Sequence, residues 1–96
     1  MLEQVAIHLR NKTDELLKEL LLCAGIEITE SDLLNMDEFK SRLEKDGYEL
    51  VTWTTFDRTY YKLTQYGIGI IQLELWTEFD ISKENKAKFM YKFSPL

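Results

Sequence analysis

The sequence predicts an α+β fold: a long N-terminal helix and a short second helix packed on one face of a four-stranded antiparallel meander. Two observations support it. Apolar residues recur at helical spacing before Gly47, whereas after it they alternate with polar residues at a period of two. The composition also shifts after Gly47 towards Tyr, Trp, Thr, Ile and Phe, which favour strands. With 96 residues, we expect a single domain spanning residues 1–96.

The first helix is predicted over residues 2–24, because its apolar positions follow one stripe at spacings of four and three. They are Leu2, Ala6, Leu9, Thr13, Leu16, Leu20 and Cys23. Gly25 follows at the place of a left-handed C-cap residue. Cys23, the single cysteine, lies in an apolar run and is expected to be a buried small apolar side chain.

Residues 4–10 also fit a strand. Val5, Ile7 and Leu9 are spaced two residues apart, and Thr13 would then cap a shorter helix. The continuous helix is favoured because the apolar stripe keeps its phase through this segment. The alternative nevertheless stays open on the sequence alone.

The second helix is predicted over residues 36–45. Asn35 and Glu38, three residues apart, resemble a capping box at its start. Thr29 and Ser31 in the preceding connection are each placed to cap a short helical turn.

Four strands follow Gly47, whose positive φ is expected to end the second helix. They are predicted over residues 48–56, 59–65, 70–79 and 87–93. The segment 67–69 is expected to form a hairpin turn, because its two glycines are free to take positive φ. Pro95 is expected to stop the last strand.

Charge predicts how the third and fourth strands pair. The register places Glu78 opposite Lys88, Trp76 opposite Met90 and Glu74 opposite Lys92. A slip by one residue would bury the charges, so this register should be firmly set. The other face of the two strands is the predicted core, covered by the long helix. It carries Ile71, Leu73, Leu75, Phe79, Phe89, Tyr91 and Phe93.

No set of residues for catalysis or metal binding emerges. His8 and Cys23 lie fifteen residues apart on one predicted helix, over about 20 Å along its axis, which is too far for a catalytic pair. One His and one Cys cannot supply the usual four zinc ligands. We therefore expect no enzymatic activity, no cofactor and no metal.

Two groups of acidic residues resemble catalytic or metal-binding sets. Asp80, Glu84 and Lys86 resemble the carboxylates and lysine of metal nucleases, but they fall within one polar hairpin loop. Glu74 and Glu78 are candidates for paired acids, but the lysines expected opposite them would keep both ionised. A solvated loop and structural ion pairs are favoured.

The net charge of −5 argues against broad nucleic-acid contact, which needs clustered Lys and Arg. The first residues lack the basic-then-apolar pattern of a signal peptide. The longest apolar run is about a third of the length that a membrane span needs. We therefore expect a cytoplasmic protein that binds neither nucleic acid nor membrane.

The sheet face opposite the helices is the candidate functional surface. It is predicted to carry Thr52, Thr54, Tyr60, Lys62, Thr64, Tyr66, Gln72, Trp76 and Met90. Which face of residues 48–56 is buried stays open, because Val51 and Trp53 compete with Leu50 for the core side. Tyr, Trp and Met are enriched at protein interfaces.

The predicted protein contacts on this face are Tyr60, Lys62, Tyr66, Trp76 and Met90. The sequence thus favours a small non-enzymatic interaction module, such as an adaptor, inhibitor or immunity-type protein, with a protein partner or self-association. The alternative is a ligand-binding or enzymatic domain whose pocket, between helix and sheet, is lined by Trp53, Tyr61 and Tyr91.

Overall fold

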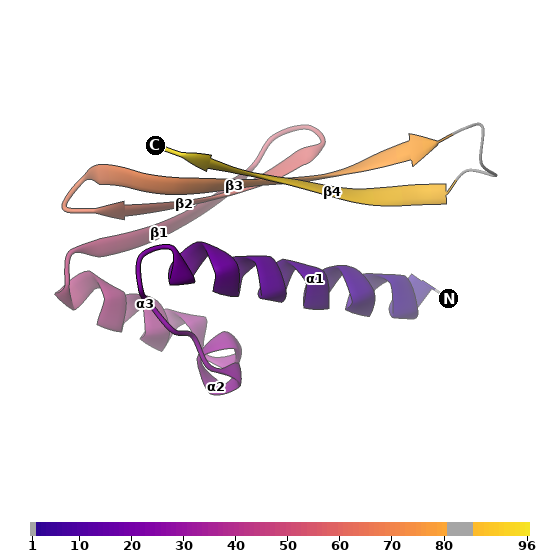
Figure 1. The fold of residues 1–96 in the computed structure, drawn as a ribbon. Helices are drawn as coiled ribbons and strands as arrows, with labels where there is room; N and C mark the ends of the chain where they lie inside the picture. The colour runs from indigo at the N-terminus through magenta and orange to yellow at the C-terminus, as the bar shows by residue number, and fades with distance from the viewer. Residues whose placement is uncertain (1, 81–85) are drawn as a thin grey trace.

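The computed structural model describes the backbone of residues 2–80 and 86–96, and the side chains of residues 12–79 and 87–96. The described elements are α1 (Leu2–Leu22), α2 (Glu30–Leu34), α3 (Met36–Lys45), β1 (Tyr48–Thr54), β2 (Arg58–Gln65), β3 (Ile68–Asp80) and β4 (Lys86–Pro95). The strands form one antiparallel sheet in the order β1-β2-β3-β4, with the helices on one face of it (Figure 1). The predicted α+β class and four-stranded antiparallel meander are therefore confirmed.

Helix α1 includes residues 4–10, the segment for which a strand was the alternative. Its packing on the sheet is described for residues 12–22, where Leu16, Leu17, Leu20 and Leu21 are buried. The described contact with the sheet is thus made by the second half of α1. The prediction that a helix packs on the sheet is confirmed, but the described side chains do not show that this helix covers the sheet along its whole length.

The end of α1 confirms one prediction and overturns another. The N–H of Gly25 donates to the carbonyl of Leu22 at 2.9 Å, and the N–H of Ile26 donates to that of Leu21 at 3.0 Å. These two bonds close a Schellman motif around Gly25, whose φ is 73°. Cys23 is exposed, so the expectation of a buried cysteine was wrong. The last buried side chain of α1 is Leu21, and Cys23 belongs to the closing turn after it.

Helix α3 has the predicted bounds, but the capping box lies one helix earlier. The Thr29 N–H donates to the Asp32 carboxylate at 3.0 Å, and the Asp32 N–H donates to the Thr29 hydroxyl at 3.1 Å. The box predicted at Asn35 was wrong, because Asn35 makes no side-chain capping bond to the helix. Asn35 also closes α2, and its amide instead donates to the carboxylate of Glu38 at 2.7 Å.

The β2–β3 turn lies earlier than predicted. Tyr66 and Gly67 both have positive φ, 51° and 80°, which is the requirement of a two-residue type I′ hairpin turn. Gly69 lies within β3 and pairs with Thr64, so its placement in the turn was wrong. Gly69 is needed for space instead, because a Cβ there would lie 2.9 Å from the Cβ of Leu96.

The predicted register of β3 with β4 is confirmed at all three pairs, Glu78 with Lys88, Trp76 with Met90 and Glu74 with Lys92. Strand β4 continues to Pro95, which pairs with Ile71. Strand β2 pairs with β3 only as far as Trp76. Beyond that point, β3 and β4 continue as a two-stranded ribbon.

The core lies between the sheet and the helices. Its sheet side is centred on Leu63 and Leu73, both fully buried, with Leu50 of β1 beside them. Leu50 pairs with Leu63. The sequence did not decide which face of β1 is buried, and the structure shows that it is the face that carries Leu50.

The predicted core face of β3 and β4 is only partly covered. Ile71, Leu73 and Leu75 are buried as predicted, but Phe79 is 71% exposed and Tyr91 is 50% exposed. These two assignments were wrong. Helix α1 packs mainly on β3 and β2, whereas Phe79 lies in the ribbon beyond β2 and Tyr91 lies on the edge strand β4.

Candidate functional site

The outer face of the sheet, opposite the helices, brings together four of the five predicted contact residues. Tyr60 pairs with Glu74, Lys62 with Gln72 and Trp76 with Met90, and all alternate along their strands with core residues. Tyr66 is separate: it lies in the β2–β3 turn, 77% exposed. A Cβ built on Gly47 would lie 2.2 Å from the Tyr66 ring, so this ring covers the start of β1.

A continuous row of side chains crosses the outer face, and it starts with two stacked rings. Trp53 of β1 and Tyr60 of β2 lie with their ring centroids 5.0 Å apart and their planes within 9°. The Tyr60 hydroxyl donates to the carboxylate of Glu74 on β3 at 3.1 Å. The stack therefore fixes both an aromatic surface and the position of a charged group on the next strand.

Arg58 continues the row towards β4. Its guanidinium donates to the same Glu74 oxygen at 2.5 Å, and its Cζ lies 4.4 Å from the centroid of the Trp76 ring. Trp76 in turn donates its indole N–H to Glu78 at 3.1 Å. The cation–π contact with Arg58 and the hydrogen bond to Glu78 together hold the Trp76 ring in place.

The two charged side chains of this row, Arg58 and Glu74, form an ion pair. The hydrogen bond from Arg58 lowers the pKa of Glu74, and the Tyr60 hydroxyl and the charge of Lys92 act in the same direction. The same contact raises the pKa of Arg58. A carboxylate with a lowered pKa stays ionised at neutral pH, so Glu74 is a poor proton donor there.

Trp53 and Arg58 belong to this row, although neither is among the contact residues predicted from the sequence. Thr52 and Thr54 were placed on the outer face instead, and that was wrong: they pair with Tyr61 and Thr59 on the core side. Leu50 is the residue from which the correct face could have been predicted. Once Leu50 is taken as the core residue of β1, alternation puts Val51 and Trp53 outside.

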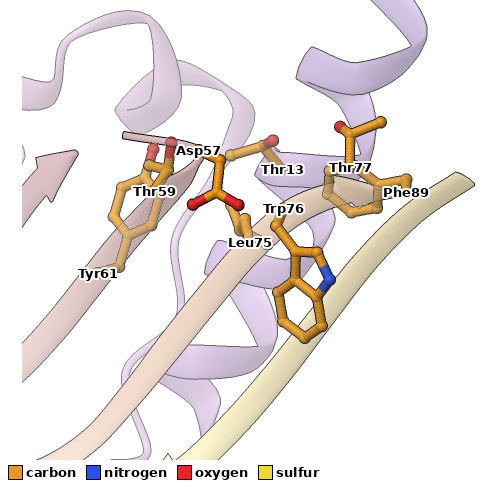
Figure 2. A pocket seen from close by; sticks show the side chains of 8 residues that line it. All are labelled: Thr13, Asp57, Thr59, Tyr61, Leu75, Trp76, Thr77 and Phe89. Atoms are coloured by element: carbon orange, nitrogen blue, oxygen red, sulfur yellow. The ribbon is translucent and has the colours of Figure 1, made fainter. Parts of the chain in front are cut away.

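Tyr61 separates two open clefts between the helices and the sheet. The larger, of about 290 Å³, is lined by Thr13, Asp57, Thr59, Tyr61, Leu75, Trp76, Thr77 and Phe89 (Figure 2). Figure 2 shows the Trp76 indole directed to the other side of β3 from Thr77. The smaller, of about 210 Å³, lies between Leu17, Met36 and Tyr61.

Burial raises the pKa of Tyr61, against a smaller lowering effect from its hydrogen bond with Thr52. The phenol is therefore neutral at physiological pH. Of the three residues predicted to line a pocket, only Tyr61 lines these clefts. Trp53 lies on the outer face of the sheet, and Tyr91 lines neither cleft.

Among the described residues, no group of three or more His, Cys, Asp or Glu side chains is placed to hold a metal ion. The side chains of His8, Asp80, Glu84 and Lys86 lie outside the described part of the chain. Within that part, no helix is both long and apolar enough to cross a membrane.

Comparison with protein-family models, with curated proteins and with solved structures found no match to this chain.

Proposed function

We propose that this protein is a small non-enzymatic interaction module that binds a protein partner through the outer face of its sheet. The observation that carries the proposal is the row from Trp53 through Tyr60, Glu74 and Arg58 to Trp76. Tyr, Trp and Arg are the residue types that dominate binding energy at interfaces.

The row also lowers the cost of binding. Stacking, ion pairing and the cation–π contact already restrict the side chains before a partner arrives. Less rotamer entropy then remains to be lost on association. Glu74 and Arg58 neutralise each other, so the aromatic rings are the expected anchors and the remaining charges of the face set the orientation.

Two Trp→Ala substitutions test this proposal. We expect the Trp53→Ala/Trp76→Ala variant to bind its partner at least about 30-fold more weakly, the ratio for the loss of about 2 kcal/mol at a hot spot. Partners are captured with the wild-type protein from an extract of the source cells, identified by mass spectrometry, purified and titrated by calorimetry.

Phe56→Ala is the matched control, because Phe56 is a fully exposed aromatic residue in the β1–β2 loop. It should leave the affinity unchanged. Equal affinity of the double Trp variant and the wild type for every purified partner would overturn the proposal.

The second candidate is a small-ligand site at the clefts beside Tyr61. The larger, at about 290 Å³, reaches only the lower limit of roughly 300 Å³ for ligand pockets. It receives less support than the outer face, because Asp57 is the one charged side chain among the described residues of its lining. Saturable binding from a fragment screen, lost in Tyr61→Ala, would favour it.

Two expectations from the sequence remain part of the proposal. The helical stripe over residues 2–9 is expected to extend the cover of α1 over the sheet. The module is expected to act in the cytoplasm, in keeping with its single cysteine.

A further inference from the structure

Strand β1 forms one edge of the sheet, and the hydrogen bonds at its two ends show which of its backbone groups point outward. The N–H of Tyr66 donates to the carbonyl of Gly47 at 2.8 Å, and the N–H of Thr55 donates to that of Arg58 at 2.9 Å. Both pairs continue the register of β1 with β2. Because hydrogen bonding alternates along an antiparallel strand, every second residue of β1 directs its N–H and C=O away from β2. These residues are Tyr48, Leu50, Thr52 and Thr54.

The outward groups of these four residues have no backbone partner in the described chain, where β1 pairs with β2 alone. Beyond the buried Leu50, residues 51–54 are all exposed. Helix α1 packs on β3 and β2, and residues 81–85 connect β3 to β4, the strand at the other edge. An unpaired edge of this kind is a template for a further strand.

The two edges of the sheet differ in the features that prevent the addition of a strand. Strand β4 carries three lysines and Pro95, which oppose such pairing. Strand β1 contains neither Lys nor Pro, and Glu49 is its one charged residue. Its register with β2 is uninterrupted, so no bulge turns it away. The edge at β1 is therefore the one suited to accept a strand.

The smaller cleft lies on the inner face beside this edge. Leu50 and Thr52 of β1 line it together with Leu17, Leu33 and Met36 of the helices, and the rest of its described lining is polar. Its volume of about 210 Å³ is below the roughly 300 Å³ of ligand pockets, but its apolar part is open to a single side chain. An added strand would lie about 4.8 Å from β1, so its inward side chains would point to this cleft.

The outward side chains of the same added strand would lie beside Val51 and Trp53, which are both 37% exposed. Trp53 is the first ring of the aromatic row on the outer face. Successive side chains of a strand point to opposite faces. One extended segment at this edge therefore reaches both the aromatic row and the smaller cleft.

We infer that the partner contributes an extended segment that pairs along the edge of β1 as a fifth strand. It places one apolar side chain beside Trp53 and another, from the opposite face, at the smaller cleft. In this mode of recognition the main-chain hydrogen bonds supply affinity, and pockets for alternate side chains supply selectivity. The inference rests on the proposed function, because it names the part of the partner that the module binds.

A display library of random ten-residue peptides, selected on the immobilised wild-type protein, supplies the probe. The enriched peptides are synthesised and titrated by fluorescence anisotropy. N-methylation removes one backbone N–H at a time, and in a strand paired on one side only every second N–H bonds to its neighbour. We expect N-methylation at alternate positions to weaken binding at least about 10-fold, and N-methylation at the intervening positions to leave it unchanged.

Thr52→Pro tests the edge from the side of the protein. It removes an N–H that points away from β2, so the pairing of β1 with β2 is kept. The peptides should bind this variant at least about 10-fold more weakly. Thr52→Ala is the matched control, because it loses the same hydroxyl, which bonds with Tyr61, but retains the N–H. Thr52→Ala should bind the peptides as the wild type does.

Three results would overturn the inference: a selection without any enriched peptide, peptides that tolerate N-methylation at every position, or peptides that bind Thr52→Pro as tightly as the wild type. If circular dichroism shows that Thr52→Pro does not fold, the N-methylation series on the wild-type protein decides. A wild-type dimer in sedimentation equilibrium that Thr52→Pro dissociates would assign the edge to a second copy of the chain instead.

Trp53→Ala/Trp76→Ala separates this inference from the proposed function. Binding that is lost in the double Trp variant but does not depend on the alternate N–H groups would keep the outer face as the site and remove the edge. Binding that depends on those N–H groups and on Thr52 but is unchanged in the double Trp variant would remove the outer face and keep the edge.

Discussion

Glu74 joins three strands of the sheet through one carboxylate. Arg58 and Tyr60 of β2 donate to it, and Lys92 of β4 lies opposite it. At the scale of single residues, this carboxylate holds the aromatic row in place, because Arg58 lies between Glu74 and the Trp76 ring. The sequence predicted the pairing with Lys92, since that depends on strand register, but not the contact with Arg58, which lies between the strands predicted over residues 48–56 and 59–65.

The lowered pKa of Glu74 makes a prediction about acid stability. A carboxylate with a lower pKa in the folded than in the unfolded protein stabilises the fold above the unfolded value of about 4.3. That contribution is lost as the pH falls through the folded pKa. Glu74→Gln should therefore be less stable than the wild type at pH 7, and the difference should shrink below about pH 4, as measured by urea unfolding.

Glu49→Gln is the matched control, because Glu49 is exposed and lies on the same outer face. At pH 7 it should lose less stability than Glu74→Gln, because the exposed Glu49 lacks the contacts that Arg58 and Tyr60 make with Glu74. A Glu74→Gln variant whose stability deficit is the same at both pH values would argue against the ion pair as the cause.

At the scale of elements, two helices end at a glycine in the left-handed conformation. Gly25 closes α1 at φ 73° and Gly47 follows α3 at φ 81°. The sequence predicted both, because a glycine directly after a helical stripe commonly adopts the left-handed conformation that ends a helix. Their surroundings differ: a Cβ at Gly25 meets nothing within 4 Å, whereas one at Gly47 would lie 2.2 Å from the ring of Tyr66.

This difference predicts unequal losses on substitution by alanine. Gly25→Ala should cost about 1–2 kcal/mol, the strain of an alanine in this conformation. Gly47→Ala should cost roughly 1 kcal/mol more, because the Tyr66 ring must also move. Thermal unfolding of both variants measures the difference. Gly47→Ala combined with Tyr66→Ala should show a deficit smaller than the sum of the two single changes, and strict additivity would contradict the clash.

At the scale of the whole molecule, cover on the sheet is uneven. Leu63 and Leu73, near its centre, are fully buried, while the hairpin end at Phe79 is largely uncovered. The central strands therefore combine hydrogen bonds on both sides with a packed face, whereas residues 77–79 of the ribbon pair only with β4 and are exposed.

Hydrogen exchange should follow this gradient along one strand. In dilute solution, we expect the amides of β3 from Ile71 to Leu75 to exchange with the slowest rates, and those of residues 77–79 to exchange faster. Peptide-level mass spectrometry or NMR measures both in one sample. Equal protection along the whole of β3 at low concentration would mean that the ribbon is stabilised within a single chain.

The sequence by itself determined the α+β class, the order of the strands and the pairing of β3 with β4. These depend on periodicity and on charges in neighbouring strands, which are local properties of the chain. Alternation shows which residues share a face, but not how far that face is covered. Only the tertiary structure decided that Leu50 points inward, that Trp53 joins the outer row, and that Phe79 and Tyr91 lie beyond the described cover of the helices. How much of the sheet is buried depends on where the shorter helices pack on it. This cannot be predicted from a local sequence pattern.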